Sequence, residues 1–138
     1  MQEHLFIKIK NTYNIITEIM QKHARKYGIN HIQLSIILLA SNKDVNVSTL
    51  AATLDITKSA VSQAITGLLV KRLVTRQVDL DDKKIYYIRP TKKALEIKND
   101  VYNCNEEKYQ MLLKEMTIEE ITQMDLLINK FNSILRNF

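Results

Sequence analysis

Residues 47–71 read VSTLAATLDITKSAVSQAITGLLVK, and this stretch decides the fold. Its first part predicts a short helix capped by Ser48, with apolar residues at helical spacing. A second helix, capped by Thr57, is expected from Lys58 to about Lys71. Only two residues separate the first helix from the second cap. Two short helices joined this tightly must cross at a steep angle, which is the helix-turn-helix geometry.

After this pair the apolar period changes from helical to alternating. Leu73 to Asp79 and Lys84 to Pro90 are rich in Val, Ile, Tyr and Thr, and they flank a charged tip, so we predict a β-hairpin. Pro90 ends the second strand, and Thr91 caps a long helix that is expected to reach about Lys114. A helix pair followed by a hairpin is a winged helix-turn-helix lobe.

Helices are predicted on both sides of this lobe. The first, from Gln2 to Lys26, carries one apolar face and ends near Gly28, and Asn30 can cap the next helix. Thr117 and Glu120 form a capping box that opens the last helix. Its apolar residues recur at spacings of three and four, which suits packing against another helix. They are Ile121, Met124, Ile128, Phe131, Leu135 and Phe138.

The expected fold is mainly α with a small β-hairpin. Two glycines and one proline in 138 residues leave room only for short breaks, and 46 % hydrophobic content is enough to bury a core. We predict a single domain over residues 1–138. Its parts are N-terminal helices in 2–40, the winged helix-turn-helix in 47–93 and C-terminal dimerisation helices in 91–138.

Residues 47–93 also contain the whole positive excess of the chain. They hold nine basic and four acidic residues, whereas the remainder holds eleven of each, and the net charge of the chain is +5. Lysine and arginine concentrated in one segment replace the counterions condensed on phosphates. This charge distribution predicts double-stranded DNA as a partner.

The second helix of the pair would enter the major groove, where Gln63 can pair bidentately with adenine. A hairpin-tip lysine would contact the minor groove or its phosphates, while Asp82 braces the other tip lysine by an ion pair. The predicted DNA-binding residues are Thr57, Lys58, Ser59, Ser62, Gln63, Thr66, Arg76, Lys83 and Lys84.

Taken together, these residues resemble the MarR family of bacterial winged-helix transcription regulators, over nearly the whole chain. Gly28-Ile29-Asn30 is similar to the start of the family's second helix, and Asp79-Leu80-Asp81-Asp82-Lys83-Lys84 is similar to its wing signature. This chain has lysines where the signature has two arginines. Asp55 and Arg72 stand where the family usually has glycine.

The resemblance implies a homodimer with the first, fifth and sixth helices interleaved, and paired recognition helices on a pseudo-palindromic operator. It also implies repression relieved by a small-molecule effector or by thiol oxidation. The expected effector pocket lies between the DNA-binding lobe and the dimer helices. Its expected neighbours are Tyr13, His31, Ile36 and Tyr102.

Other functions are less well supported by the sequence. No catalytic constellation, phosphate-binding glycine loop or metal-ligand spacing is present, so we expect no enzyme activity, no cofactor and no metal. The single cysteine, Cys104, excludes an internal disulfide but leaves a redox-responsive regulator as an alternative. A second alternative is a winged helix that is used for protein interaction. Without a signal sequence or an apolar run of membrane length, the expected location is cytoplasmic, away from membranes.

Overall fold

The computed structural model describes residues 2–138, with side chains from His4 onward. The chain divides into two compact units, Met1–Val101 and Tyr102–Phe138. Within residues 2–138, no helix is both long enough and apolar enough to cross a membrane. Helices and one hairpin account for the regular structure of this range, so the expected mainly α fold with a small β-hairpin is confirmed.

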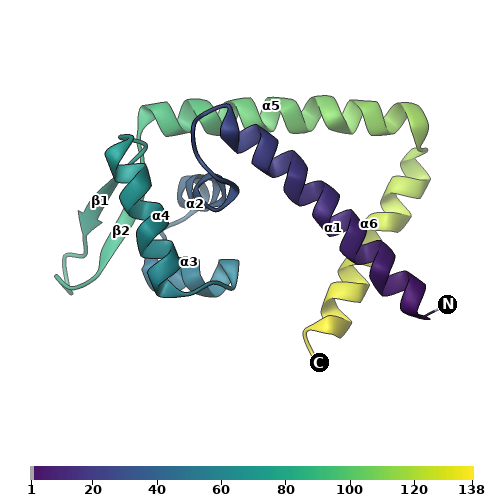
Figure 1. The fold of residues 1–138 in the computed structure, drawn as a ribbon, viewed down its shortest axis with the longest axis horizontal. Helices are drawn as coiled ribbons and strands as arrows, with labels where there is room; N and C mark the ends of the chain where they lie inside the picture. Colours follow the sequence, from purple (N-terminus) through teal and green to yellow (C-terminus); the bar gives the residue numbers. More distant parts are fainter. Residues whose placement is uncertain (1) are drawn as a thin grey trace. The chain divides into compact units, whose positions relative to one another are not determined.

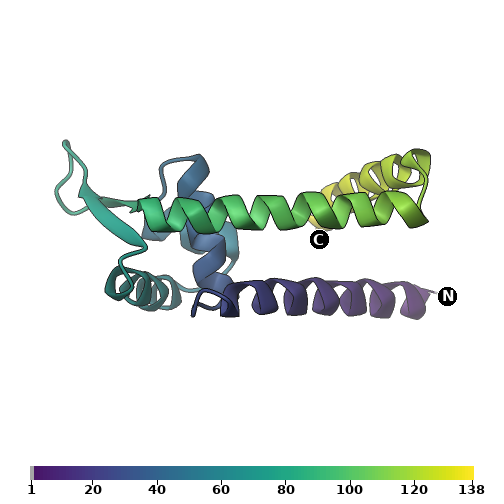
Figure 2. The ribbon, with the colours of Figure 1, turned by 90° about the horizontal axis from the view of Figure 1, so that it is seen from above.

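The first unit contains the predicted winged helix-turn-helix (Figures 1 and 2). In both views the hairpin lies at the end of this unit away from the N-terminus of α1. The elements are α1 (Gln2–Arg25), α2 (His31–Asn42), α3 (Val47–Leu54), α4 (Lys58–Val70), β1 (Val74–Val78), β2 (Tyr86–Pro90) and the start of α5 (Lys92–Glu115).

Local caps set most of the helix starts. The side chains of Asn30 and Thr57 accept backbone N–H groups three residues on, as predicted. The prediction for the first helix of the pair was wrong by two residues. Asn46, not Ser48, is its cap: the Asn46 side chain accepts the N–H of Thr49, whose hydroxyl oxygen accepts the N–H of Asn46. Ser48 therefore lies inside α3.

Among residues 2–138, two residues other than glycine adopt the left-handed conformation that favours glycine. Asp55, after α3, has φ 53°, and Arg72, after α4, has φ 56°. In each case the N–H of the next residue returns to the helix that has just ended, from Ile56 to Ala51 and from Leu73 to Leu68. Both turns therefore close in the way that a glycine C-cap closes, although neither residue is glycine.

The hydrophobic core of this unit lies beneath the helix pair and the root of the hairpin. α3 packs on α4, and α2 packs on α4 and β2. The N–H of Ile88 on β2 donates to the carbonyl of Val45, in the loop before α3, at 3.0 Å. The largest side chains with essentially no exposed surface are Leu34, Ile36, Ile37, Leu50, Ile65, Leu68, Leu73 and Ile88. The wing is thus attached to the helices at its root.

The hairpin is antiparallel, with Val74 opposite Pro90 and Val78 opposite Tyr86. Side chains alternate between its two faces. One face buries Val74 and Ile88 in the core and continues outward through Arg76. The other face carries polar groups, which are described with the site.

The second unit contains the rest of α5 and α6 (Ile118–Leu135). Thr117 and Glu120 form the predicted capping box. α6 buries none of its residues within the chain. α1 buries Ala24 near its end, but its earlier apolar residues are exposed: Phe6 is 54 % exposed and Tyr13 67 %. Apolar surface of this extent, on helices at both ends of the chain, is typical of an interface with another molecule.

Candidate nucleic-acid interface

The outward face of α4 carries the polar side chains that were predicted to meet DNA. Lys58, Ser59, Ser62, Gln63 and Thr66 are all exposed, whereas Val61, Ala64, Ile65 and Leu68 are buried beneath them. The buried stripe attaches α4 to α3, α2 and β1. The structure thus places the five polar residues together on one helix face, with Gln63 near its middle.

Two of the predicted residues are already used in local hydrogen bonds. The Thr57 hydroxyl oxygen accepts the N–H of Ala60 at 3.0 Å. The Thr66 hydroxyl donates to the carbonyl of Ser62 at 2.9 Å, so its hydrogen is committed to the helix. Toward DNA, Thr66 would therefore offer its methyl group and the oxygen as an acceptor. A methyl group at this point suits contact with the methyl of thymine.

The wing tip is held by carboxylates that accept backbone N–H groups. One oxygen of Asp79 accepts the N–H of Asp81 at 2.8 Å and that of Asp82 at 3.4 Å, and its other oxygen accepts the Tyr87 hydroxyl at 2.9 Å. These bonds, from Asp81 first and then from Tyr87, hold the pKa of the Asp79 carboxyl below its ordinary value. The hydrogen bond to Asp79, and then the negative charge of Asp79, raise the pKa of Tyr87.

Asp82 braces the wing in a different way from the one predicted. Its carboxylate accepts the backbone N–H of Lys84 at 3.0 Å, and the structure records no ion pair from it to a lysine side chain. The bond fixes the turn because a carboxylate two residues back closes a local ring. Both lysine side chains at the tip are exposed and remain available to a phosphate.

Arg76 is positioned by an aromatic ring. Its guanidinium carbon lies 4.8 Å from the centroid of Tyr86, on the face of the hairpin that continues from the core. A guanidinium stacked on a ring keeps its donors free at the edge. Arg76 therefore presents its charge in a defined direction beside the wing tip.

The four residues expected around an effector differ widely in exposure and come from both units. Ile36 has no exposed surface, Tyr13 is exposed on α1, and His31 is half-buried at the start of α2. Tyr102 belongs to the second unit. A cavity of about 370 Å³ instead lies between the end of α1 and the start of α5, and none of these four residues lines it.

Sequence reasoning missed several residues that shape this surface. Asn46 has a cap signal, since Thr49 follows at the third position, but Ser48 competes for the same role. Gln33 has a local signal as the third residue after the Asn30 cap, but its second bond, to the carbonyl of Ala64, has none. Tyr87 gave no local signal, because its partner Asp79 lies on the other side of the wing tip. Among residues 4–138, no group of three or more His, Cys, Asp or Glu side chains could hold a metal ion.

A helix-turn-helix with an exposed polar second helix and a lysine-tipped wing defines a winged-helix protein. Known proteins agree with this class. A model of the MarR family matches residues 27–85. The HTH-type transcriptional regulator MhqR of Bacillus subtilis (strain 168) is 21 % identical over 118 residues, which cover 85 % of this chain and 81 % of that protein.

Solved structures show the same fold along the whole chain. FabT of Streptococcus pneumoniae, solved in complex with DNA, has a TM-score of 0.85 at 18 % identity and covers 99 % of both chains. A MarR transcriptional regulator from Methanosarcina mazei Go1 has a TM-score of 0.81 at 22 % identity, again over 99 % of both chains. The family model, the relative and the solved structures all show similarity to the MarR family of transcription regulators, the family model over the helix-turn-helix and the start of the wing and the other two over most of the chain.

Proposed function

We propose that the chain is a homodimeric repressor that binds a pseudo-palindromic DNA operator and is released by a small-molecule effector. The observation that carries the DNA-binding proposal is the outward face of α4, where Lys58, Ser59, Ser62, Gln63 and Thr66 are exposed together. The FabT structure in complex with DNA supports it, because the fold of that protein is the same.

Two substitutions distinguish a residue that reads bases from a residue that contacts phosphates. Gln63→Ala is expected to weaken binding to the operator relative to random DNA by about 1–3 kcal/mol, because the amide is the group placed to read a base. Lys84→Ala should weaken binding to both sequences about equally and lower the salt slope by about one, because a lysine at the wing tip meets phosphates. Fluorescence anisotropy at several salt concentrations measures both effects. If Gln63→Ala weakened binding to the operator and to random DNA equally, Gln63 would not be a base-reading residue.

The homodimer is proposed from the exposed apolar residues of α1 and α6. A chain that leaves this much apolar surface uncovered buries it in an assembly. Two copies of α4 related by a two-fold axis would then meet two half-sites one helical turn apart, which is why the operator is expected to be pseudo-palindromic.

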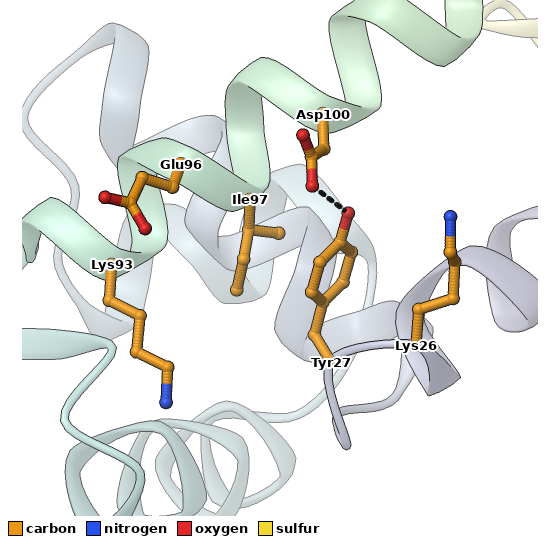
Figure 3. A pocket seen from close by; sticks show the side chains of 6 residues that line it. All are labelled: Lys26, Tyr27, Lys93, Glu96, Ile97 and Asp100. Atoms are coloured by element: carbon orange, nitrogen blue, oxygen red, sulfur yellow. Dashed lines mark hydrogen bonds between the residues drawn. The ribbon is translucent and has the colours of Figure 1, made fainter.

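The cavity at the end of α1 is the effector site that we propose (Figure 3). It is lined by Lys26, Tyr27, Lys93, Glu96, Ile97 and Asp100. The Tyr27 hydroxyl donates to Asp100 at 2.9 Å, with Lys26 on one side and Lys93 on the other. Two ammonium groups and two carboxylates around an aromatic ring and an isoleucine suit a small zwitterion with an apolar part.

A thermal-shift comparison tests the ligand class. Phenylalanine, as an amphiphilic zwitterion, should raise the melting temperature more than phenylacetate or phenethylamine, which each keep one of its two charges, because only the zwitterion satisfies both kinds of lining group. Lys93→Ala should abolish the difference, whereas Lys92→Ala, the neighbouring lysine outside the cavity, should not. Equal shifts with all three compounds would contradict the zwitterion assignment.

A further inference from the structure

We propose that Tyr87 is a positioning residue for DNA binding, because it connects the wing tip to the body of the winged-helix unit through Asp79 and Arg89. The inference rests on the proposed DNA-binding function and adds a residue that would not itself touch DNA. It concerns the polar face of the hairpin, where Gln77 lies opposite Tyr87 and Thr75 lies opposite Arg89.

The connection starts outside the hairpin. Arg89 on β2 forms an ion pair with Asp44, in the loop between α2 and α3, and donates from its Nε to the Oε1 of Gln77 at 2.8 Å. The Arg89 guanidinium carbon lies 5.6 Å from the centroid of the Tyr87 ring. The arginine thus contacts the helical body, the opposite strand and the tyrosine ring at once.

The connection then reaches the tip. The Tyr87 hydroxyl donates to one oxygen of Asp79, and the other oxygen of Asp79 accepts the N–H groups of Asp81 and Asp82. Asp82 in turn accepts the N–H of Lys84. An unbroken run of polar contacts therefore joins the loop before α3 to the backbone of the wing lysine.

These contacts fix the position of the wing tip and add little to the stability of the fold. Asp44 is 66 % exposed and Arg89 32 %, so solvent screens their ion pair and it adds little to the free energy of folding. A two-stranded hairpin is only marginally stable by itself, and its outer half has no core beneath it, since Val78 is 53 % exposed and Leu80 97 %. The polar face is what fixes the direction of this outer half.

Tyr87→Phe tests the inference, because it removes one hydroxyl and keeps the ring beneath Arg89. We expect operator binding about five- to tenfold weaker and a salt slope shallower by about one to two, as for the loss of one or two phosphate contacts. Discrimination between the operator and random DNA, which depends on α4, should not change. Thr75→Val is the matched control: it removes an exposed hydroxyl from the same face of the hairpin, opposite Arg89, keeps the branched side chain and should bind as the unmodified protein does.

A second variant separates position from charge. Asp79→Ala removes a negative charge beside the wing tip, so simple electrostatics predicts tighter binding, whereas loss of the contacts to Tyr87 and to the turn predicts weaker binding. Carbon-detected NMR of the carboxyl provides an independent readout. In Tyr87→Phe the pKa of Asp79 should rise toward 3.8 but stay below it, because the larger cause, the Asp81 N–H, remains.

The outcomes are distinct. Wild-type affinity and salt slope in Tyr87→Phe would overturn the positioning role, as would an equal loss in Thr75→Val or tighter binding by Asp79→Ala. An unmodified protein without salt-dependent DNA binding would instead overturn the proposed function itself.

Discussion

Ile128→Glu on α6 is expected to convert the proposed homodimer into monomers and to weaken operator binding by about 10²–10⁴-fold, the advantage that a second linked module provides. Ile128 is 50 % exposed in the chain and belongs to the apolar series that was predicted to pack against another helix. A carboxylate in the centre of a buried apolar interface loses its hydration without gaining a partner, which opposes association strongly.

Sedimentation velocity gives the oligomeric state, and anisotropy on operator DNA gives the affinity. Thr122→Glu is the matched control, because it introduces the same charge on another face of the same helix, where the side chain is also exposed. It should remain dimeric. Deletion of residues 117–138 should give monomers as well, and an intact dimer after that deletion would contradict the interleaved-helix proposal.

The elements that the sequence predicted well are those that depend on neighbouring residues. The caps at Asn30, Thr57 and Thr117 follow from side chains that bond N–H groups three residues on, so the pattern contains both partners. The error at Ser48 has the same origin. Asn46 and Ser48 are both good caps, and the reciprocal bond between Asn46 and Thr49 is what distinguishes the actual cap.

The site was predicted unevenly for a related reason. The exposed face of α4 follows from helical period, and its five polar residues are where the period puts them. The bonds within the wing tip are local, but the contacts that attach the tip to the rest of the unit join residues that are 8 to 45 positions apart, such as Tyr87 with Asp79 and Arg89 with Asp44. No local pattern contains such pairs. The cavity between α1 and α5 likewise exists only after the chain has folded.

Gly67 shows how a residue that weakens a helix by itself can be required by its surroundings. Glycine inside a helix is about 1 kcal/mol less favourable than alanine, so Gly67→Ala on α4 would ordinarily stabilise the protein. Here a Cβ atom at Gly67 would lie 2.5 Å from the Nε2 of Gln33, which is closer than real Cβ atoms come to atoms of other residues. The substitution therefore forces Gln33 to move.

Both polar atoms of the Gln33 side-chain amide are hydrogen-bonded, so the side chain has little freedom to move. Its Oε1 accepts the N–H of Asn30 at 3.0 Å, and its Nε2 donates to the carbonyl of Ala64 at 3.3 Å in the interior. A buried polar group that loses its partner destabilises a protein by about 1–3 kcal/mol. Because this exceeds the helix-propensity gain, Gly67→Ala is expected to lower the free energy of unfolding by about 1 kcal/mol.

The same substitution should have the opposite sign once Gln33 is gone. In a Gln33→Ala background the space beside Gly67 is empty, so Gly67→Ala should raise the free energy of unfolding by about 1 kcal/mol, and the coupling between the two sites should be about 2 kcal/mol. Urea denaturation of the four proteins closes this double-mutant cycle. Additive effects, or a stabilising Gly67→Ala in the unmodified chain, would show that Gln33 does not determine the residue at position 67. Either result would also mean that, in solution, α4 lies farther from α2 than the short Gln33–Gly67 distance requires.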